Sequence, residues 1–379
     1  VEVGPHPILT GSILDIAGAG HGSARAFDTL RKSDGAEDDP VLRTVLDLVA
    51  HGAPFDSVAL VGAKPPQPIA LPSYPFQRER HLLASTAESL TVFGGVLESG
   101  PRHPLLGARV AEGAPEWRHL LDPILLPLLG DHRVNGAVVV PAAGLIEMAL
   151  AAGRDIYGAA PLALRDFDVL NALVVSADET REISTRFAEA TQTIEIWSRR
   201  RFARDKWFLH ARGRLSPLSE QSRTILDPPV QDQTLIDSPE EVYAEARRSG
   251  VDYGPCFQVV RRCERDRFTT HVWLEQPLGG MGAFSDIYVL NPISIDAAFH
   301  ALFIARPQGE GETKAHLPIR FQNISLFAPG AKIHRAMTRL THETERYKTV
   351  SISFLDGEGA LVAAVEGAVQ RAVWFASGS

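Results

Sequence analysis

Cysteine is almost absent from this chain: Cys256 and Cys263 are the only two among 379 residues. Two cysteines are too few for the disulfide framework that holds many small secreted proteins together. The sequence also has no CxxC or HxH spacing of the kind that binds a metal ion. We therefore expect neither a disulfide-stabilised fold nor a bound metal.

Long apolar runs are missing as well. No stretch reaches the roughly 18 apolar residues that a membrane-spanning helix needs, and the run from Leu120 to Leu129 is interrupted by Pro123 and Pro127. The opening residues Val1-Glu2-Val3 lack the basic and then apolar order of a signal peptide. We expect a cytoplasmic protein that does not contact a membrane.

Positive charge is not in excess, since the formal net charge is -8 at pH 7. That balance argues against a nucleic-acid partner. One local basic cluster contains Arg199, Arg200, Arg201, Arg204 and Lys206, with Trp197 and Trp207 on either side. The flanking tryptophans favour a solvated hairpin tip. The alternative is a docking patch for an acidic partner protein.

The residues that are present are typical of a soluble globular protein, with 45% hydrophobic and 22% charged residues. The length allows two or three units with cores of their own. Two units of strands around one long helix predict an α+β architecture. The divisions that we expect are a satellite and connector region at 1–90, a first unit at 91–218, a polar linker at 219–236 and a second unit at 237–379.

Hydrophobic periodicity and capping signals predict the elements of these units. Ser238-Pro239-Glu240-Glu241 is a capping box, and Gly250 is placed to end the helix that it starts. Further helices are expected at 39–49, 142–152 and 294–305, and strands at 191–196, 206–215, 269–274, 324–326, 337–341, 348–355 and 361–373.

His132 is the most informative residue. It is followed by Gly136 and then by Pro141, and this proline opens an apolar helix. The pattern holds a titratable imidazole at a tight turn, beside an apolar strand and a helix N-terminus. Such a place suits removal of a proton from carbon. The alternative is a buried histidine with a structural role only.

Asp296 lies in a predicted helix that Asn291 or Ser294 is able to cap. Asp296 and His300 are four residues apart, so they share one face beside the apolar stripe of that helix. The alternative for a carboxylate near a first turn is a simple interaction with the helix dipole. A third segment, 250–257, places Tyr253 and Phe257 around the Gly254-Pro255 turn.

Together these segments resemble the dehydratase domains of modular type I polyketide synthases, from about residue 103 to 371. His132, Gly136 and Pro141 match the family's HxxxGxxxxP motif, and Gly250 to Phe257 match GYxYGPxF with valine in second place. Asp296 and His300 match DxxxQ/H, and Leu317-Pro318 match a later LP motif. The resemblance implies a double hotdog fold, in which an antiparallel sheet wraps a long helix in each half.

The first ninety residues carry a different resemblance. Residues 1–9 are similar to the C-terminal end of a polyketide synthase acyltransferase domain, and residues 71–80 to the linker that follows such domains. The GHSxG nucleophile motif of an acyltransferase is absent from the sequence. This region is therefore expected to act as an N-terminal remnant and linker, without acyl transfer of its own.

The resemblance implies dehydration of a 3-hydroxyacyl thioester to the 2,3-unsaturated thioester, with His132 as general base and Asp296 as general acid. It also implies support from Tyr253 and His300 through hydrogen bonds to Asp296. Amides near Ala143 and Gly144 are placed to stabilise charge on the thioester oxygen. The remaining positions that we expect at the site are Gly136 and Pro141 as catalytic support, and Gly254, Pro255, Phe257, Leu317 and Pro318 at the substrate.

Two other functions remain open at this point. One is a dehydratase that also closes an oxygen heterocycle by conjugate addition, because the same base and acid serve both steps. The other is a catalytically silent, structural dehydratase-like domain. A double-bond isomerase is disfavoured because Asp296 is present, and an aldol-type cyclising domain by the acyltransferase tail and the Tyr253-Gly254-Pro255 turn.

No cofactor is expected, because elimination of water changes no oxidation state. The substrate would arrive on the phosphopantetheine arm of an acyl carrier protein. The expected partners are that carrier protein, the neighbouring acyltransferase, ketosynthase and ketoreductase domains, and a second copy in a homodimer. We expect neither nucleic acid nor a membrane among them.

Overall fold

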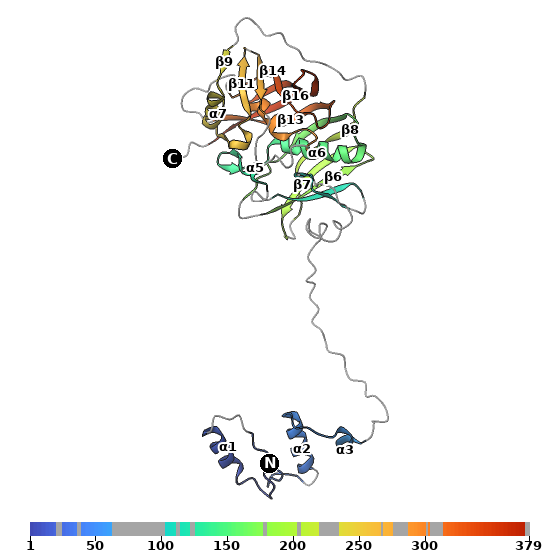
Figure 1. The fold of residues 1–379 in the computed structure, drawn as a ribbon, viewed down its shortest axis with the longest axis vertical. Helices are drawn as coiled ribbons and strands as arrows, with labels where there is room; N and C mark the ends of the chain where they lie inside the picture. Colours follow the sequence, from blue (N-terminus) through green and yellow to red (C-terminus); the bar gives the residue numbers. More distant parts are fainter. Residues whose placement is uncertain are drawn as a thin grey trace. The chain divides into compact units, whose positions relative to one another are not determined.

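A computed structural model describes most of the chain, which separates into two compact units, Val1–Arg80 and His81–Ser379 (Figure 1). The described residues are 1–19, 25–35, 39–62, 103–110, 114–121, 126–176, 180–202, 206–219, 235–266, 268–275, 287–300, 302–303 and 314–375. Residues 71–80, which resemble a linker, and most of the predicted linker at 219–236 lie outside them.

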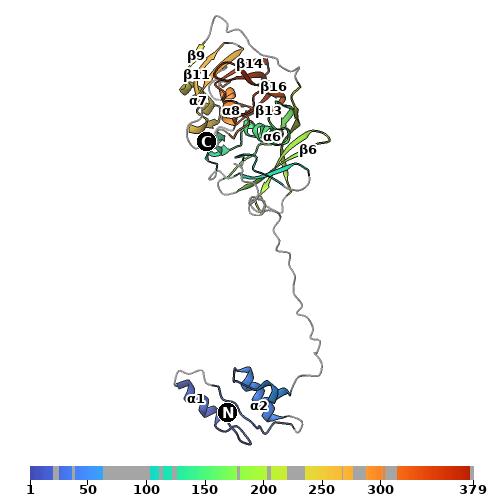
Figure 2. The ribbon, with the colours of Figure 1, turned by 45° about the vertical axis from the view of Figure 1, so that its right-hand side comes forward.

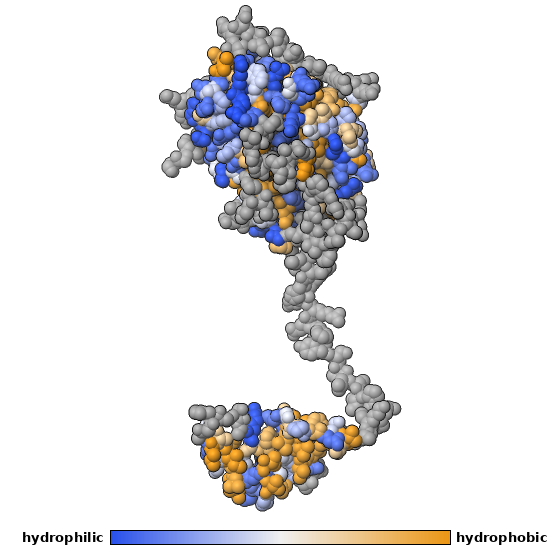
Figure 3. Space-filling view, in the orientation of Figure 1, coloured by the Kyte–Doolittle hydropathy of each residue, from blue (hydrophilic) through white to orange (hydrophobic). Residues whose placement is uncertain are grey.

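The N-terminal unit contains the helices α1 (Thr10–Ala19), α2 (Pro40–Ala50) and α3 (Ser57–Val61). Asp39 caps α2 by accepting from two backbone amides, and Pro40 occupies its first turn, so the helix predicted at 39–49 is confirmed. Among its described residues only Thr44 is fully buried, whereas many of its large apolar side chains are exposed. Figure 3 shows this apolar surface in orange. The unit thus presents an apolar face that its own described residues do not cover.

The larger unit is built on one antiparallel sheet. Thirteen strands of its described residues form the order β1-β2-β6-β7-β8-β5-β13-β16-β15-β14-β12-β11-β9. The first-half strands are β1 (Ala108–Arg109), β2 (Glu116–Leu121), β5 (Leu162–Val169), β6 (Arg181–Ala188), β7 (Thr193–Arg200) and β8 (Phe208–Pro217). The second-half strands are β9 (Leu235–Asp237), β11 (Val260–Arg265), β12 (Thr269–Leu274), β13 (Lys314–Leu326), β14 (Arg335–Glu343), β15 (Tyr347–Leu355) and β16 (Leu361–Trp374).

Each half of this sheet has its own long helix. The helix α6 (Ala142–Tyr157) packs on β5, β6, β7 and β8, and α8 (Pro292–His300) packs on β12 and β14. The two helices also contact each other, as Figure 2 shows. The two halves are joined through the pairing of β5 with β13. This is the predicted double hotdog, and its fold class is confirmed.

Most of the predicted elements are present with shifted ends. The capping box at Ser238 is formed and starts α7 (Pro239–Arg248), while Gly250 follows that helix with a φ of 86°. The helix predicted at 294–305 begins earlier, at Pro292, and ends at His300. Residues 235 and 236, which we expected in the linker, pair with β11 as part of β9. The second half therefore begins at residue 235 or before it.

Candidate active site

His132 begins a short hairpin of β3 (His132–Val134) and β4 (Ala137–Val138). The two residues of its loop, Asn135 and Gly136, have φ values of 47° and 77°. Positive φ at both positions defines a tight turn that favours the sequence Asn-Gly. A Cβ atom on Gly136 would meet no other atom within 4 Å. Glycine is needed at this position for its backbone angle.

A hydrogen bond to Val139, just after the hairpin, decides which tautomer the neutral His132 ring adopts. Nδ1 lies 2.7 Å from the carbonyl oxygen of Val139, which accepts hydrogen bonds only, so Nδ1 is the nitrogen that donates. Nε2 of the neutral ring then keeps its lone pair. Only 7% of His132 is exposed, and Nε2 lies 3.9 Å from Oδ2 of Asp296. The structure therefore joins the two predicted catalytic residues, and gives the imidazole the tautomer of a base.

Asp296 is the fifth residue of α8, which Asn291 caps by accepting hydrogen bonds from the amides of Ile293 and Ser294. Asp296 thus lies just beyond the first turn of α8, whereas the alternative interpretation, an interaction with the helix dipole, assumed a place near that turn. The interaction of a side chain with the helix dipole falls off within the first turn, so the dipole alone does not account for a carboxyl group at this position. Asp296 is 5% exposed.

His300 lies on the same face of α8, as the spacing predicted. Its Nε2 is 3.0 Å from Oδ2 of Asp296, and the ring is fully buried. Burial lowers the pKa of His300, and the neighbouring Asp296 opposes that shift. A neutral His300 donates from Nε2, so it orients the carboxyl group and leaves the other oxygen of Asp296 for the substrate.

Tyr253 enters the site from β10 (Val251–Tyr253), where it pairs with His132 across the small sheet β10-β3-β4. The centroid of its ring is 3.8 Å from that of His300 and 5.6 Å from that of His132. Burial raises the pKa of Tyr253 well above its usual value, and the negative charge of Asp296 adds to this shift. The described contacts of Tyr253 include no hydrogen bond to Asp296, unlike our expectation. Its place is against the histidine rings.

Asp131 is a site residue to which the sequence analysis gave no role. Its backbone oxygen accepts from the amide of Gly254 at 2.7 Å, and its Oδ2 accepts from the amide of Cys256 at 2.8 Å. A Cβ atom on Gly254 would lie 2.4 Å from Cγ of Asp131, so glycine is needed here for space. Asp131 thus fixes the short helix η1 (Pro255–Phe257) beside His132, whose ring centroid is 5.5 Å from that of Phe257.

Pro141 and Gly144 lie at the start of α6. Pro141 is the N-cap residue, with a φ of -62°. The amide of Gly144 donates to the carbonyl oxygen of Pro141 at 2.9 Å, so this amide is already engaged. The amide of Ala143 has no hydrogen-bond partner in the described part of the chain. Of the two donors that we expected for a thioester oxygen, Ala143 is the better placed.

Leu317 and Pro318 lie on β13, where the register with β16 shifts between Pro318 and Arg320. Leu317 packs against the hydrophobic core. Among the described residues, no hydrogen bond or ring contact joins either residue to His132 or Asp296. Their predicted place at the substrate stays a prediction.

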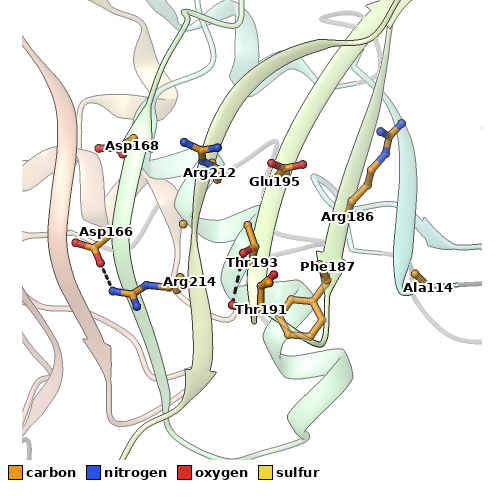
Figure 4. A pocket seen from close by; sticks show the side chains of 12 residues that line it. Ala114, Asp166, Asp168, Arg186, Phe187, Thr191, Thr193, Glu195, Arg212 and Arg214 are labelled. Carbon is orange, nitrogen blue, oxygen red and sulfur yellow. Dashed lines mark hydrogen bonds and ion pairs between the residues drawn. The ribbon is translucent and has the colours of Figure 1, made fainter.

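An open hollow of about 680 Å³ lies on the first half of the sheet, away from His132 and Asp296 (Figure 4). Its lining alternates in charge across neighbouring strands. In the strand register, Arg186 lies opposite Glu195, and Glu195 lies opposite Arg212. Arg212 in turn lies opposite Asp168. Figure 4 also shows the ion pair between Asp166 and Arg214. Because these charges balance one another, we assign the hollow no part in the chemistry.

The predicted basic cluster is partly neutralised. Arg199 binds Glu182 at 2.7 Å and lies over the ring of Trp207, with 4.5 Å to its centroid. Arg201 lies over the ring of Phe202. These contacts are typical of a locally satisfied hairpin, while Arg204 lies outside the described residues. No helix among the described residues is both long enough and apolar enough to cross a membrane.

The fold and the facing His132 and Asp296 define a double hotdog protein whose site lies between its two halves. Two family models match the chain. One is described as a polyketide synthase dehydratase domain and matches residues 103–199, and the other as a polyketide synthase dehydratase N-terminal domain and matches residues 225–373. The chain belongs to the dehydratase domains of modular polyketide synthases, which are hydro-lyases.

Individual relatives agree with this family. Polyketide synthase GfsE of Streptomyces halstedii is 31% identical over 98% of this chain, and mycoketide-CoA synthase of Mycobacterium tuberculosis is 30% identical over 98%. The chain covers 10% and 9% of these two proteins, so it spans about a tenth of their length.

Solved structures agree as well. The dehydratase domain from the CurF module of curacin polyketide synthase is 25% identical with a TM-score of 0.61, over 73% of this chain and 100% of that one. A variant of the GphF dehydratase is 28% identical with a TM-score of 0.62, over 72% and 100%.

Proposed function

We propose that the domain removes water from a 3-hydroxyacyl thioester that is carried on the phosphopantetheine arm of an acyl carrier protein, and leaves the 2,3-unsaturated thioester. One observation carries this proposal. An imidazole nitrogen with a free lone pair and a carboxyl group face each other at 3.9 Å, from different halves of the fold. Elimination of water needs one acceptor and one donor of a proton, on either side of two adjacent carbons.

In this proposal His132 acts as the base. Its Nε2 removes the proton from C2 of the substrate, and the electrons of that C–H bond form the double bond between C2 and C3. The hydrogen bond from Nδ1 to Val139 supports the imidazolium that results, because the carbonyl oxygen accepts from a charged donor. A positioned base of this kind typically contributes about 10²–10⁴-fold to the rate.

Asp296 acts as the acid. As the bond between C3 and oxygen breaks, the carboxyl group gives its proton to the leaving hydroxyl, which departs as water. His300 binds one carboxyl oxygen, so the proton is carried on the other. A bound acyl chain excludes water from Asp296, and loss of water favours the neutral form of a carboxyl group. After release of the product, a proton passes from His132 back to Asp296, and both groups regain their starting state.

Negative charge also develops on the thioester oxygen as C2 loses its proton. The amide of Ala143, at the N-terminus of α6, is the donor that we assign to this oxygen. Gly254, Pro255 and Phe257 form the wall beside His132, and Leu317 and Pro318 are proposed to line the acyl chain. Pro141 and Gly136 act indirectly, since they shape the start of α6 and the His132 hairpin.

The test is direct. The protein is incubated with a 3-hydroxyacyl thioester on a carrier protein or on pantetheine, and the acyl group is followed by mass spectrometry. The expected result is loss of the mass of one water, together with the ultraviolet absorbance of a conjugated thioester. An unchanged substrate would favour the silent structural domain. A substrate with a distal hydroxyl group, followed by analysis for a ring, separates the dehydratase from the dehydratase that also cyclises.

The partners are part of the same proposal. The relatives are multidomain polyketide synthases, so acyltransferase, ketosynthase and ketoreductase domains are the expected neighbours, and the domain is expected to form a homodimer. We assign residues 1–90 to the C-terminal end of an acyltransferase domain and the linker that follows it. The exposed apolar face of this unit, which includes Ile8, Ile16, Val41 and Val58, supports that assignment, because packing on a larger domain would cover it.

A further inference from the structure

Glu147 is a fully buried carboxylate in the middle of α6 that the proposed chemistry does not use. Three N–H groups converge on it. Oε1 accepts from Nε2 of His103 at 2.9 Å and from the amide of Val289 at 2.6 Å, and Oε2 accepts from the amide of Leu290 at 2.8 Å. Burial raises the pKa of Glu147, and these hydrogen bonds oppose that shift.

The ring of His103 is fixed as a donor to this carboxylate. Its Nδ1 accepts hydrogen bonds from the amides of Leu105 and Leu106, at 3.2 and 3.0 Å. A nitrogen that accepts carries no proton, so the proton of the neutral ring is on Nε2, which faces Glu147. Every partner of Glu147 is therefore a donor, and an ionised carboxylate fits this place.

The partners of Glu147 connect it to the catalytic acid. Val289 and Leu290 immediately precede Asn291, whose side chain caps α8 and so fixes the start of the helix that carries Asp296. The helix α6 begins at Ala142, three residues after Val139, and the Val139 carbonyl holds the ring of His132. The helix α6 is thus connected to both groups. The segment just before its N-terminal end holds the ring of His132, and Glu147 in its middle holds the two residues that precede the cap of α8.

We infer that Glu147 is a positioning residue that sets the distance between Asp296 and His132 by holding the start of α8 against α6. This inference rests on the proposed dehydration. A buried carboxylate is costly to desolvate, and an apolar side chain of similar volume often serves stability as well or better. The specific benefit of a carboxylate here is that it binds two consecutive backbone amides, those of Val289 and Leu290. It thereby fixes the position of this segment along α6.

The test compares Glu147→Gln with Glu182→Gln. Glu182 is a matched control, because it is also a fully buried glutamate of the first half, but it binds Arg118 and Arg199 on the sheet and has no contact with the site. Glutamine at position 147 keeps an acceptor at one oxygen and places an NH₂ group against an N–H donor at the other. We expect kcat to fall by about 10- to 100-fold, as for a misplaced catalytic group, with KM within about twofold. The control is expected to lose thermal stability and to keep kcat.

Glu147→Asp and Glu182→Asp form a second pair in case the glutamine variants do not fold. Aspartate keeps the charge and shortens the side chain by one methylene, so Glu147→Asp is expected to fold and to lose kcat, while Glu182→Asp keeps it. A wild-type kcat in folded Glu147→Gln or Glu147→Asp would overturn the inference, as would an equal fall of kcat in the controls. If the wild-type protein itself releases no water, the proposed function fails, which is a different outcome.

Discussion

Tyr253 lies directly opposite His132 in the antiparallel pairing of β10 with β3, and its ring rests against that of His300. The second half of the chain therefore lies against His132 through two elements, this strand and α8. The Tyr253 ring contacts both the ring of His132, the proposed base, and the ring of His300, which binds Asp296. The two halves are coupled at the site itself, in addition to the pairing of their sheets.

The first prediction concerns the base. His132→Ala is expected to lower the rate of water loss by about 10²–10⁴-fold, because the proposed base for the proton on C2 is removed. The rate is measured by mass spectrometry on a 3-hydroxyacyl thioester. His210→Ala is the matched control, because His210 is equally buried but bonds Ser198 and the carbonyl of Asn171 within the sheet. A His132→Ala protein with most of its activity would remove His132 as base.

The acid gives the second prediction. Asp296→Asn keeps the shape of the side chain and its hydrogen bond from His300, but an amide does not supply the proton of a carboxylic acid. The rate is expected to fall by about 10²–10⁴-fold with little change in thermal stability. Asp155→Asn, a change on the far end of α6 where Asp155 binds Arg109, is expected to keep full activity. Dehydration by Asp296→Asn at close to the wild-type rate would place the acid elsewhere.

Tyr253→Phe is expected to give a smaller loss, of roughly threefold to tenfold, since the base and acid contribute far more. The ring contacts with His300 and His132 remain in this variant, and the hydroxyl group has no bond to Asp296 to lose. Tyr243→Phe provides the contrast: its hydroxyl accepts from the amide of Val260 at 2.9 Å, so this variant should lose stability and keep kcat. A loss for Tyr253→Phe as large as that for Asp296→Asn would show that the phenol itself transfers a proton.

The juxtaposition of His132 and Asp296 was predictable from the sequence, and the surroundings of these two residues were not. The spacing of His132, Gly136 and Pro141 is local, and so is the spacing of Asp296 and His300. The contacts of Asp131 with Gly254 and Cys256 join residues more than 120 positions apart, and a single sequence carries no signal for such a pair. Glu147 did leave a signal, as the one charged residue among the apolar residues of its helix from Ala142 to Ala152.

The length of β13 shows why strand ends were harder to predict. We expected a strand at 324–326 and the structure extends it back to Lys314. Pro318 and the polar residues around it obscure the alternation that marks a strand. The pairing with β5 begins only at Arg320, so Pro318 lies beyond that neighbour and its missing N–H costs no ladder bond there. Tertiary pairing with β16 decides the extent of this strand.

Stability is expected to fall on acidification. Burial lowers the pKa of His316 from 6.5 to about 4, with help from Lys348 and Lys314. Between these two values the unfolded chain binds a proton that the folded chain does not, so the free energy of unfolding decreases as the pH falls from 6.5 towards 4. His300 and His210, whose pKa values are also lowered by burial, act in the same direction.

The measurement is thermal unfolding at several pH values in that range, followed by circular dichroism. In His316→Gln the dependence of the melting temperature on pH should be shallower than in the wild-type protein. His342→Gln serves as the control, because His342 lies on β14 of the same sheet with its side chain exposed. Equal slopes for the wild-type protein and His316→Gln would rule out this contribution of His316.

Replacement of either of two glycines of the site should lower the free energy of unfolding, for a different reason in each case. Gly136→Ala adds a side chain in open space at a φ of 77°, which costs about 1–2 kcal/mol for the left-handed backbone alone. Gly254→Ala has an ordinary φ of -75° but places its Cβ atom against the Asp131 side chain, and overpacking of this kind costs about 1–3 kcal/mol. Asp131→Ala should therefore reduce the cost of Gly254→Ala and leave that of Gly136→Ala unchanged. Denaturant unfolding of the single and double variants measures the coupling free energy between Asp131 and each glycine. Equal coupling free energies for Gly136 and Gly254 would show that the two glycines respond to one shared strain.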